Sequence, residues 1–135
     1  MSDYHVLKNA SLTALNANEN VVVIGSGAGG VIGENNLSIG KNSLEQNTTG
    51  EDNVAVGTSA LRNNTSGQNN VAIGSSVLYS NTTANYNIGL GYRSLYSNTV
   101  GQYNVGIGYE SLYSNTTGES NTAVGYNALK TNTTG

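Results

Sequence analysis

Hydrophobic and polar positions recur with a 17-residue period from residue 36 onward, in six copies of one pattern. Each copy starts at an Asn, numbered position 1 here. These residues are Asn36, Asn53, Asn70, Asn87, Asn104 and Asn121. Positions 2 and 4 are aliphatic in most copies, whereas position 3 is Ser, Ala or Gly. This alternation predicts one short strand per copy, with the aliphatic face buried.

The remaining positions of the repeat predict bends and turns. Position 5 is Gly in every copy, positions 12 and 13 are always Asn-Thr, and position 15 is Gly except at Ala84. Position 9 is always Leu: Leu44, Leu61, Leu78, Leu95, Leu112 and Leu129. Glycine allows a sharp bend, and Asn-Thr-Thr-Gly is typical of turns. Because one repeat is too short for a strand and a crossover helix, the chain is expected to coil on itself.

We therefore predict an all-β fold, a parallel β-solenoid or β-roll of 17-residue coils. Residues 36–135 form six repeats, the last one incomplete, and residues 1–35 form an N-terminal cap or attachment segment with a degenerate initial coil. Equivalent residues of successive coils lie about 4.8 Å apart in such a stack. The position 1 Asn residues should then form an amide ladder, and the position 9 Leu residues a continuous apolar spine.

A coil of this size buries little apolar surface, so we expect several chains to associate. The small side chains at position 3 are predicted to point away from the aliphatic face and to admit a neighbouring backbone. These residues are Ser38, Ala55, Ala72, Gly89, Gly106 and Ala123. The pattern thus predicts a homo-oligomer built around a strip of small residues.

A glycine motif, Gly25-x-Gly27-x-x-Gly30, follows the apolar run "VVVI" and has the spacing of a dinucleotide-binding turn. That motif requires a following helix, but the next residues contain further glycines and lack helical periodicity. We interpret these glycines as bends of the degenerate initial coil and expect no cofactor.

Composition offers little material for catalysis. The chain has no Cys, one histidine (His5), 10% charged residues and a formal net charge of -3. The adjacent acids Glu51 and Asp52 fall at turn positions, where carboxylates are usually solvated. We therefore expect no enzyme activity, no metal site and no nucleic-acid partner. Neither a signal-peptide pattern nor a membrane-spanning stretch is recognisable, so no membrane insertion is expected.

The Asn-Thr pairs admit other interpretations. Five triplets fit the N-glycosylation rule, and they begin at Asn47, Asn64, Asn81, Asn115 and Asn132. The position 13 threonines also form a column that resembles an ice-binding array. Turn formation explains both features more simply, because Asn and Thr side chains bond locally to the backbone of turns.

Tyrosines gather in the later copies, at positions 6, 10 and 17. They are the candidate ligand-binding residues Tyr79, Tyr86, Tyr92, Tyr96, Tyr103, Tyr109, Tyr113 and Tyr126. Tyrosine offers apolar area and a polar edge, which suits glycans and protein partners. The alternative is that these rings fill grooves between coils or between chains.

The repeats "YNVGIGYESLYSNTTGES" and "NTAVGYNALKTNTTG" resemble the repeat arrays of bacteriophage tail fibres. The shorter element "NVAIG" is similar to the head repeats of trimeric autotransporter adhesins. Both resemblances imply a homotrimer of parallel β-structure that stands on a surface.

The tail-fibre resemblance implies a structural segment that spaces or carries a host-adhesive end. It implies a virion appendage, assembled in the host cytoplasm and extracellular when functional. A host-surface glycan or protein, and a virion protein at the N-terminus, are the expected partners. The alternative is an adhesin head-like module that itself binds a glycan or protein receptor.

Overall fold

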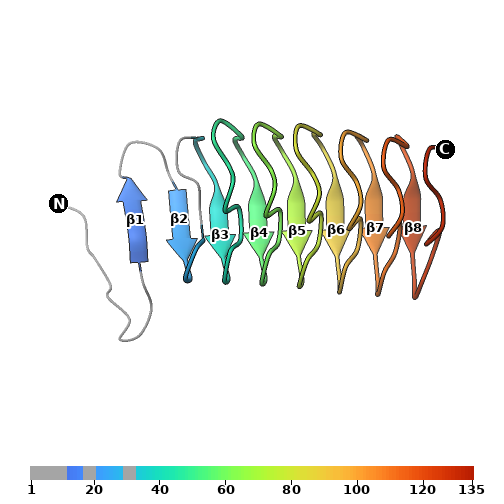
Figure 1. Ribbon diagram of the computed structural model, residues 1–135, viewed down its shortest axis with the longest axis horizontal. Coiled ribbons are helices and arrows are strands. Elements are labelled where there is room, and N and C mark those ends of the chain that lie inside the picture. The colour runs from blue at the N-terminus through green and yellow to red at the C-terminus, as the bar shows by residue number, and fades with distance from the viewer. Residues whose placement is uncertain (1–11, 17–20, 29–32) are drawn as a thin grey trace.

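The computed structural model describes residues 12–16, 21–28 and 33–135, and side chains from residue 23 onward. It is a parallel β-solenoid of 17-residue coils, as the repeat predicts, and its strands form one row (Figure 1). The strands are β1 (Leu12–Asn16), β2 (Val21–Ile24), β3 (Leu37–Ile39), β4 (Val54–Val56), β5 (Val71–Ile73), β6 (Ile88–Leu90), β7 (Val105–Ile107) and β8 (Thr122–Val124).

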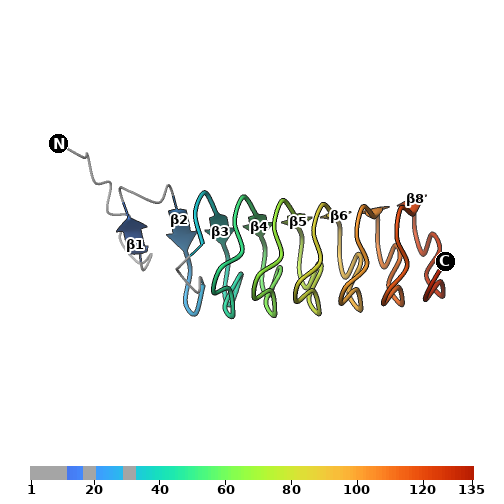
Figure 2. The same cartoon turned by 90° about the horizontal axis from the view of Figure 1, so that it is seen from above.

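Strands β2 to β8 are parallel and pair in sequence order, whereas β1 pairs with β2 in the antiparallel direction. Seen from above, the strands lie along one side of the coils and the turns along the other (Figure 2). From β3 onward each strand residue pairs with the equivalent residue of the next repeat, such as Leu37 with Val54. The coils are numbered 1 to 6, starting at the six position 1 residues.

The described residues of the initial segment include strand β2, which pairs with β3, and the bend at Gly25. Val22 pairs with Leu37, whereas Leu37 pairs with the more distant Val54, so the initial coil is shorter than the next one. Gly25 has a φ of 135°, close to the 131° of Gly40 at the equivalent bend. The glycines are thus bends, as predicted, although Gly30 lies outside the described residues. A capping or attachment role for residues 1–35 stays a prediction.

The position 1 Asn residues form the expected ladder inside the corner before each strand. The backbone amide of Asn53 donates to Oδ1 of Asn36 at 2.9 Å, and its Nδ2 donates to the carbonyl of Gly67 at 2.8 Å. The first bond joins two coils, and the second closes one coil on itself. Asn70, Asn87 and Asn104 repeat both bonds. The ladder therefore sets both the stacking register and the length of the coil.

A second ladder runs through the Asn residues at position 12. Asn64 Nδ2 donates to the carbonyl of Gly67 at 3.0 Å and to Oδ1 of Asn47 at 2.9 Å. The Gly67 carbonyl thus accepts from both Asn columns. A Cβ at Gly67 would lie 2.4 Å from Asn64 Oδ1 and 2.4 Å from the carbonyl oxygen of Ala84. This crowding explains the glycine preference at position 15.

The backbone turns through left-handed conformations at fixed positions of every coil. Gly at position 5 has φ between 112° and 136°, a region that side chains other than glycine's rarely allow. Positions 7, 9 and 17 also have positive φ, and position 9 is Leu with φ between 46° and 52°. Leucine is uncommon in this region, at a cost on the order of 1 kcal/mol. The Leu side chain is retained because it fills the interior.

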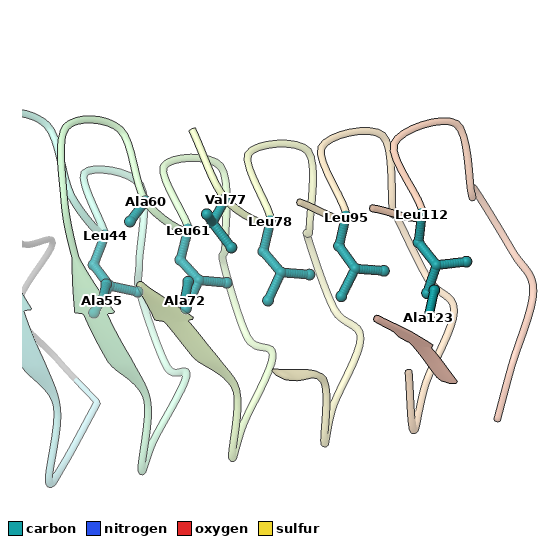
Figure 3. Close-up of a cluster of buried hydrophobic side chains, with 10 residues drawn as sticks. All are labelled: Leu44, Ala55, Ala60, Leu61, Ala72, Val77, Leu78, Leu95, Leu112 and Ala123. Carbon is teal, nitrogen blue, oxygen red and sulfur yellow. The ribbon is translucent and has the colours of Figure 1, made fainter. Parts of the chain in front are cut away.

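The apolar spine at position 9 is confirmed. Leu44, Leu61, Leu78, Leu95 and Leu112 are fully buried and lie one behind another along the solenoid (Figure 3). Leu129 of the last coil has no coil on its outer side and is 50% exposed.

The predicted placement of position 3 was wrong. Its small residues line the interior beside the Leu spine, instead of forming an outward strip. The aliphatic residues at positions 2 and 4 are the ones that point outward, partly exposed, in every coil. The reason is the room inside a 17-residue coil, which the Leu side chain nearly fills.

Local packing shows how narrow this interior is. A Cβ at Gly89 would lie 2.4 Å from Cγ1 of Val77, and one at Gly106 would lie 2.6 Å from Oγ of Ser94. Val77 and Ser94 occupy position 8, the third interior position. Where position 8 carries the larger Val, the facing strand residue is glycine. The interior thus has no room for a larger side chain at either Gly89 or Gly106.

Replacing Asn70 with Ala should lower the free energy of unfolding, because it leaves the amide of Asn87 and the carbonyl of Ala84 without bonds from that side chain. The Ala84 carbonyl still accepts from Asn81 Nδ2, so the Asn87 amide is the buried group left unsatisfied, at a cost of about 1–3 kcal/mol. Urea denaturation followed by circular dichroism measures the change. Asn63→Ala, on the turn at position 11, is the matched control. Equal losses for the two variants would contradict the structural role of the ladder.

Leu95→Asp and Leu129→Asp change equivalent residues with similar backbone angles, φ 52° and 47°, but opposite burial, 0% and 50% exposed. The unpaired buried charge of Leu95→Asp should lower the free energy of unfolding by more than about 4 kcal/mol. This variant should therefore lose its β-structure. Leu129→Asp should remain folded. Far-UV circular dichroism distinguishes the two, and similar spectra would argue against a dry interior at position 9.

Candidate functional site

Position 10 forms a column of side chains along the turn side of the solenoid. In order these are Glu45, Arg62, Tyr79, Tyr96, Tyr113 and Lys130. Arg62 Nε donates to Glu45 Oε2 at 2.5 Å, and Nη1 donates to the Tyr79 hydroxyl at 3.1 Å. The Glu45 hydrogen bond raises the pKa of Arg62 above its ordinary value. Each residue thus contacts its neighbour in the next coil, and the column begins with an ion pair.

The middle of this column is a stack of tyrosine rings. The ring centroids of Tyr79 and Tyr96 are 5.0 Å apart, and those of Tyr96 and Tyr113 are 5.2 Å apart. Lys130 Nζ lies 5.9 Å from the Tyr113 centroid and 2.5 Å from Oε2 of Glu110. The hydrogen-bonded Glu110 carboxylate raises the pKa of Lys130. Because Tyr96 stacks on Tyr79 on one side and on Tyr113 on the other, both faces of its ring are covered.

A second column lies beside the first. At position 6, the centroids of Tyr92 and Tyr109 are 5.3 Å apart, and those of Tyr109 and Tyr126 are 5.2 Å apart. Arg93 connects the two columns, because its Cζ lies 5.0 Å from the Tyr92 centroid and 5.5 Å from the Tyr96 centroid. Six tyrosines in two columns thus form one surface, called here the tyrosine array.

Two charged residues of this surface were not among the candidate site residues of the sequence analysis. Arg93 and Glu110 both occupy position 7, and Glu110 is buried despite its charge. The sequence did hold a signal for these two residues. Position 7 lies between the two tyrosine positions, 6 and 10, in the same turn. The sequence alone did not indicate that this turn brings the two tyrosine columns together.

The third column, at position 17, is separate from the array. Tyr86 and Tyr103 stack with centroids 5.2 Å apart and rings within 2° of parallel. Tyr86 and Tyr103 precede strands β6 and β7, whereas the position 6 tyrosines follow these strands. A strand therefore separates the position 17 column from the position 6 column. Their exposed fractions are 50% and 55%.

Stacking restricts what these tyrosines can bind. Sugars and flat ligands stack on aromatic faces, but neighbouring rings cover both faces of Tyr96 and Tyr109 and one face of each of the other six tyrosines. The columns present ring edges and hydroxyls to solvent, and a phenol hydroxyl both donates and accepts hydrogen bonds. All eight predicted residues thus stack on an equivalent residue of a neighbouring coil. Ligand binding by these residues stays a prediction.

The Asn-Thr pairs belong to the turns. The position 12 Asn side chains of coils 1 to 5 are buried and bonded within the second ladder, so their Nδ2 atoms are inaccessible to glycosylation in the folded chain. In five coils the position 13 Thr hydroxyl donates to the Thr carbonyl of the next coil, at 2.9 to 3.3 Å. Turn formation therefore accounts for both features.

In the part of the chain that the structure describes, no group of His, Cys, Asp or Glu side chains is placed to hold a metal ion. No helix in the same part is long and apolar enough to cross a membrane. His5 lies outside the described residues.

Comparisons with protein-family models, curated proteins and solved structures find no match to this chain.

The stacks predict a stability difference within the array. Tyr96→Ala removes two stacked pairs, whereas Tyr126→Ala removes one from a ring that is 75% exposed. Each aromatic pair contributes about 0.5–1.5 kcal/mol beyond area burial. Tyr96→Ala should therefore lower the free energy of unfolding, measured by urea denaturation, by at least about 1 kcal/mol more than Tyr126→Ala does. A greater loss for Tyr126→Ala would show that stacking does not stabilise the coils.

Proposed function

We propose that this chain is a structural segment of a homotrimeric phage or viral tail fibre, which spaces or carries a host-adhesive end. One observation carries the proposal: a stack of identical coils exposes a continuous aliphatic sheet face. A stack held by side-chain ladders and backbone bonds in every coil suits a rigid spacer. The resemblance to tail-fibre repeats agrees with this role.

The outer face of β3 to β8 is formed by positions 2 and 4. Eleven of these twelve residues are Val, Ile or Leu, and the exception is Thr122. Ile73 and Ile88, in the middle of the row, are 41% and 39% exposed. An uncharged aliphatic face of this extent is typical of an interface. Three such faces around one axis would bury six side chains per coil level.

This face replaces the strip of small residues as the proposed contact between chains. It also explains why β-branched residues are used on the outside of the coils. In a trimer they would be core residues, and the branched side chains suit a pleated sheet surface. The thin interior of each chain would then be supplemented by a second apolar core on the trimer axis.

A second candidate function is an adhesin head-like module that binds a glycan or protein receptor. The exposed edges and hydroxyls of Tyr109, Tyr126 and their neighbours favour it, because such groups suit adaptable polar contacts. Tyr109 is stacked on both faces, which favours a protein or hydroxyl-mediated contact over sugar stacking, whereas Tyr126 is stacked on one face. Loss of receptor binding by a folded, assembled Tyr109→Ser variant would support this role.

Static light scattering on the purified chain tests the trimer. We expect three times the chain mass at micromolar concentration. Ile88→Lys should shift the protein to a folded monomer, because it places a charge in the proposed apolar contact. Thr83→Lys, on an exposed turn, should leave the trimer intact. A stable wild-type monomer, or equal effects of both substitutions, would contradict the proposal.

A further inference from the structure

Two exposed tyrosine columns flank the same two strands, one at each end. Tyr86 precedes β6 and Tyr92 follows it, and Tyr103 and Tyr109 flank β7 in the same way. The exposed fractions of these four residues lie between 41% and 55%. Tyrosine thus stands at both ends of β6 and β7, whereas β8 has Ser120 before it and Tyr126 after it.

The pairing of residue types extends to the earlier coils. β4 is flanked by Asp52 and Thr58, and β5 by Asn69 and Ser75. Each pair joins a side chain with an acceptor oxygen to a hydroxyl donor, so the two members are complementary in hydrogen bonding. At β4 to β7 the residues at the two ends of a strand thus match in chemistry, polar at β4 and β5 and aromatic at β6 and β7. At β8 the match ends, because Ser120 stands opposite Tyr126.

The two members of each pair do not meet within one chain. The strand between them spans about 10 Å, since a strand rises roughly 3.3 Å per residue. No ring contact joins the position 17 column to the position 6 column among the described residues. The match is therefore unexplained by contacts inside the coil.

A ring of identical chains brings the pairs together. When the rotation axis runs along the solenoid, equivalent residues of all chains stay at one height. Three outer sheet faces turned toward that axis form a triangle. At each corner the end of one sheet meets the start of the next, so position 6 of one chain faces position 17 of its neighbour. The contact joins different columns and is heterologous.

We infer that the corners of the trimer are in-register contacts between position 6 of one chain and position 17 of the next. Tyr92 and Tyr109 of one chain then pack against Tyr86 and Tyr103 of another. Exposed tyrosines suit this contact, because their rings add apolar area and a phenol hydroxyl buried at the corner can bond to a partner across it. The inference rests on the proposed trimer and adds its corner contacts, its register and its heterologous geometry.

Cysteine cross-linking tests the corner directly, because the chain contains no Cys. The double variant Tyr103→Cys with Tyr109→Cys places both thiols at one level. Mild oxidation with diamide should give a covalent trimer on a non-reducing denaturing gel, and reductant should return it to monomer. A link within one chain is excluded, because a disulfide needs Cα atoms within about 7 Å.

Matched controls separate register from mere proximity. Either cysteine alone should give no covalent trimer, since a heterologous contact never joins a residue to itself. Tyr103→Cys with Thr58→Cys places the thiols three coils apart and should also remain unlinked. Asp52→Cys with Thr58→Cys repeats the in-register test at the polar level, without disturbing the tyrosine stacks, and should again give covalent trimer.

Light scattering on the same samples separates the inference from the proposed function. A native trimer in which neither in-register pair forms covalent trimer would overturn the corner contact and leave the trimer standing. Efficient linking of the mismatched pair would overturn the register. A native monomer would overturn the proposed trimer, and the corner contact with it.

Discussion

A 17-residue coil encloses room for one large side chain, and the rest of the structure depends on that limit. Leu occupies the space at position 9, so positions 3 and 8 are mostly Ala, Ser or Gly. Where Val77 enlarges position 8, Gly89 faces it, and an added Cβ there would lie only 2.4 Å away. The branched side chains of the strand therefore have to point outward. A single chain then has a narrow core inside and an apolar sheet face outside.

Side-chain amides compensate for the small core. The turns leave many backbone groups without strand partners, and a buried polar group without a bond is costly. The two Asn columns satisfy these groups, since Asn53 and Asn64 both donate to the Gly67 carbonyl. Because each amide also bonds its equivalent in the neighbouring coil, closing a coil and stacking it become one event. Any insertion within a coil would break both, which accounts for the constant repeat length.

The sequence predicted the coil length, the strand positions, the Asn ladders and the Leu spine. The coil length, the ladders and the spine depend on invariant residues, which stacking converts directly into columns. The strand positions follow from the alternation at positions 2 to 4. The orientation of the strand was mispredicted, because alternation at Val54, Ala55 and Val56 shows that two faces differ without showing which one is inside. That choice depends on where the turn places Leu61, and Leu61 has a left-handed backbone that propensity does not anticipate. The charged neighbours Arg93 and Glu110 escaped notice for a related reason, since their contacts follow from the path of the turn.

The tyrosines follow from the same geometry in a different way. The repeat places equivalent residues one above another, which favours side chains that stack on an identical neighbour. Tyrosine at position 6 or 10 of one coil therefore favours tyrosine at the same position of the next coil. Stacking explains why Tyr79, Tyr96 and Tyr113 follow one another in a column. It does not explain why two columns at opposite ends of a strand, Tyr86 with Tyr103 and Tyr92 with Tyr109, start at the same strand, β6. Within the described chain no ring contact joins these two columns. The proposed contact between symmetry-related chains at equal height would supply the missing interaction.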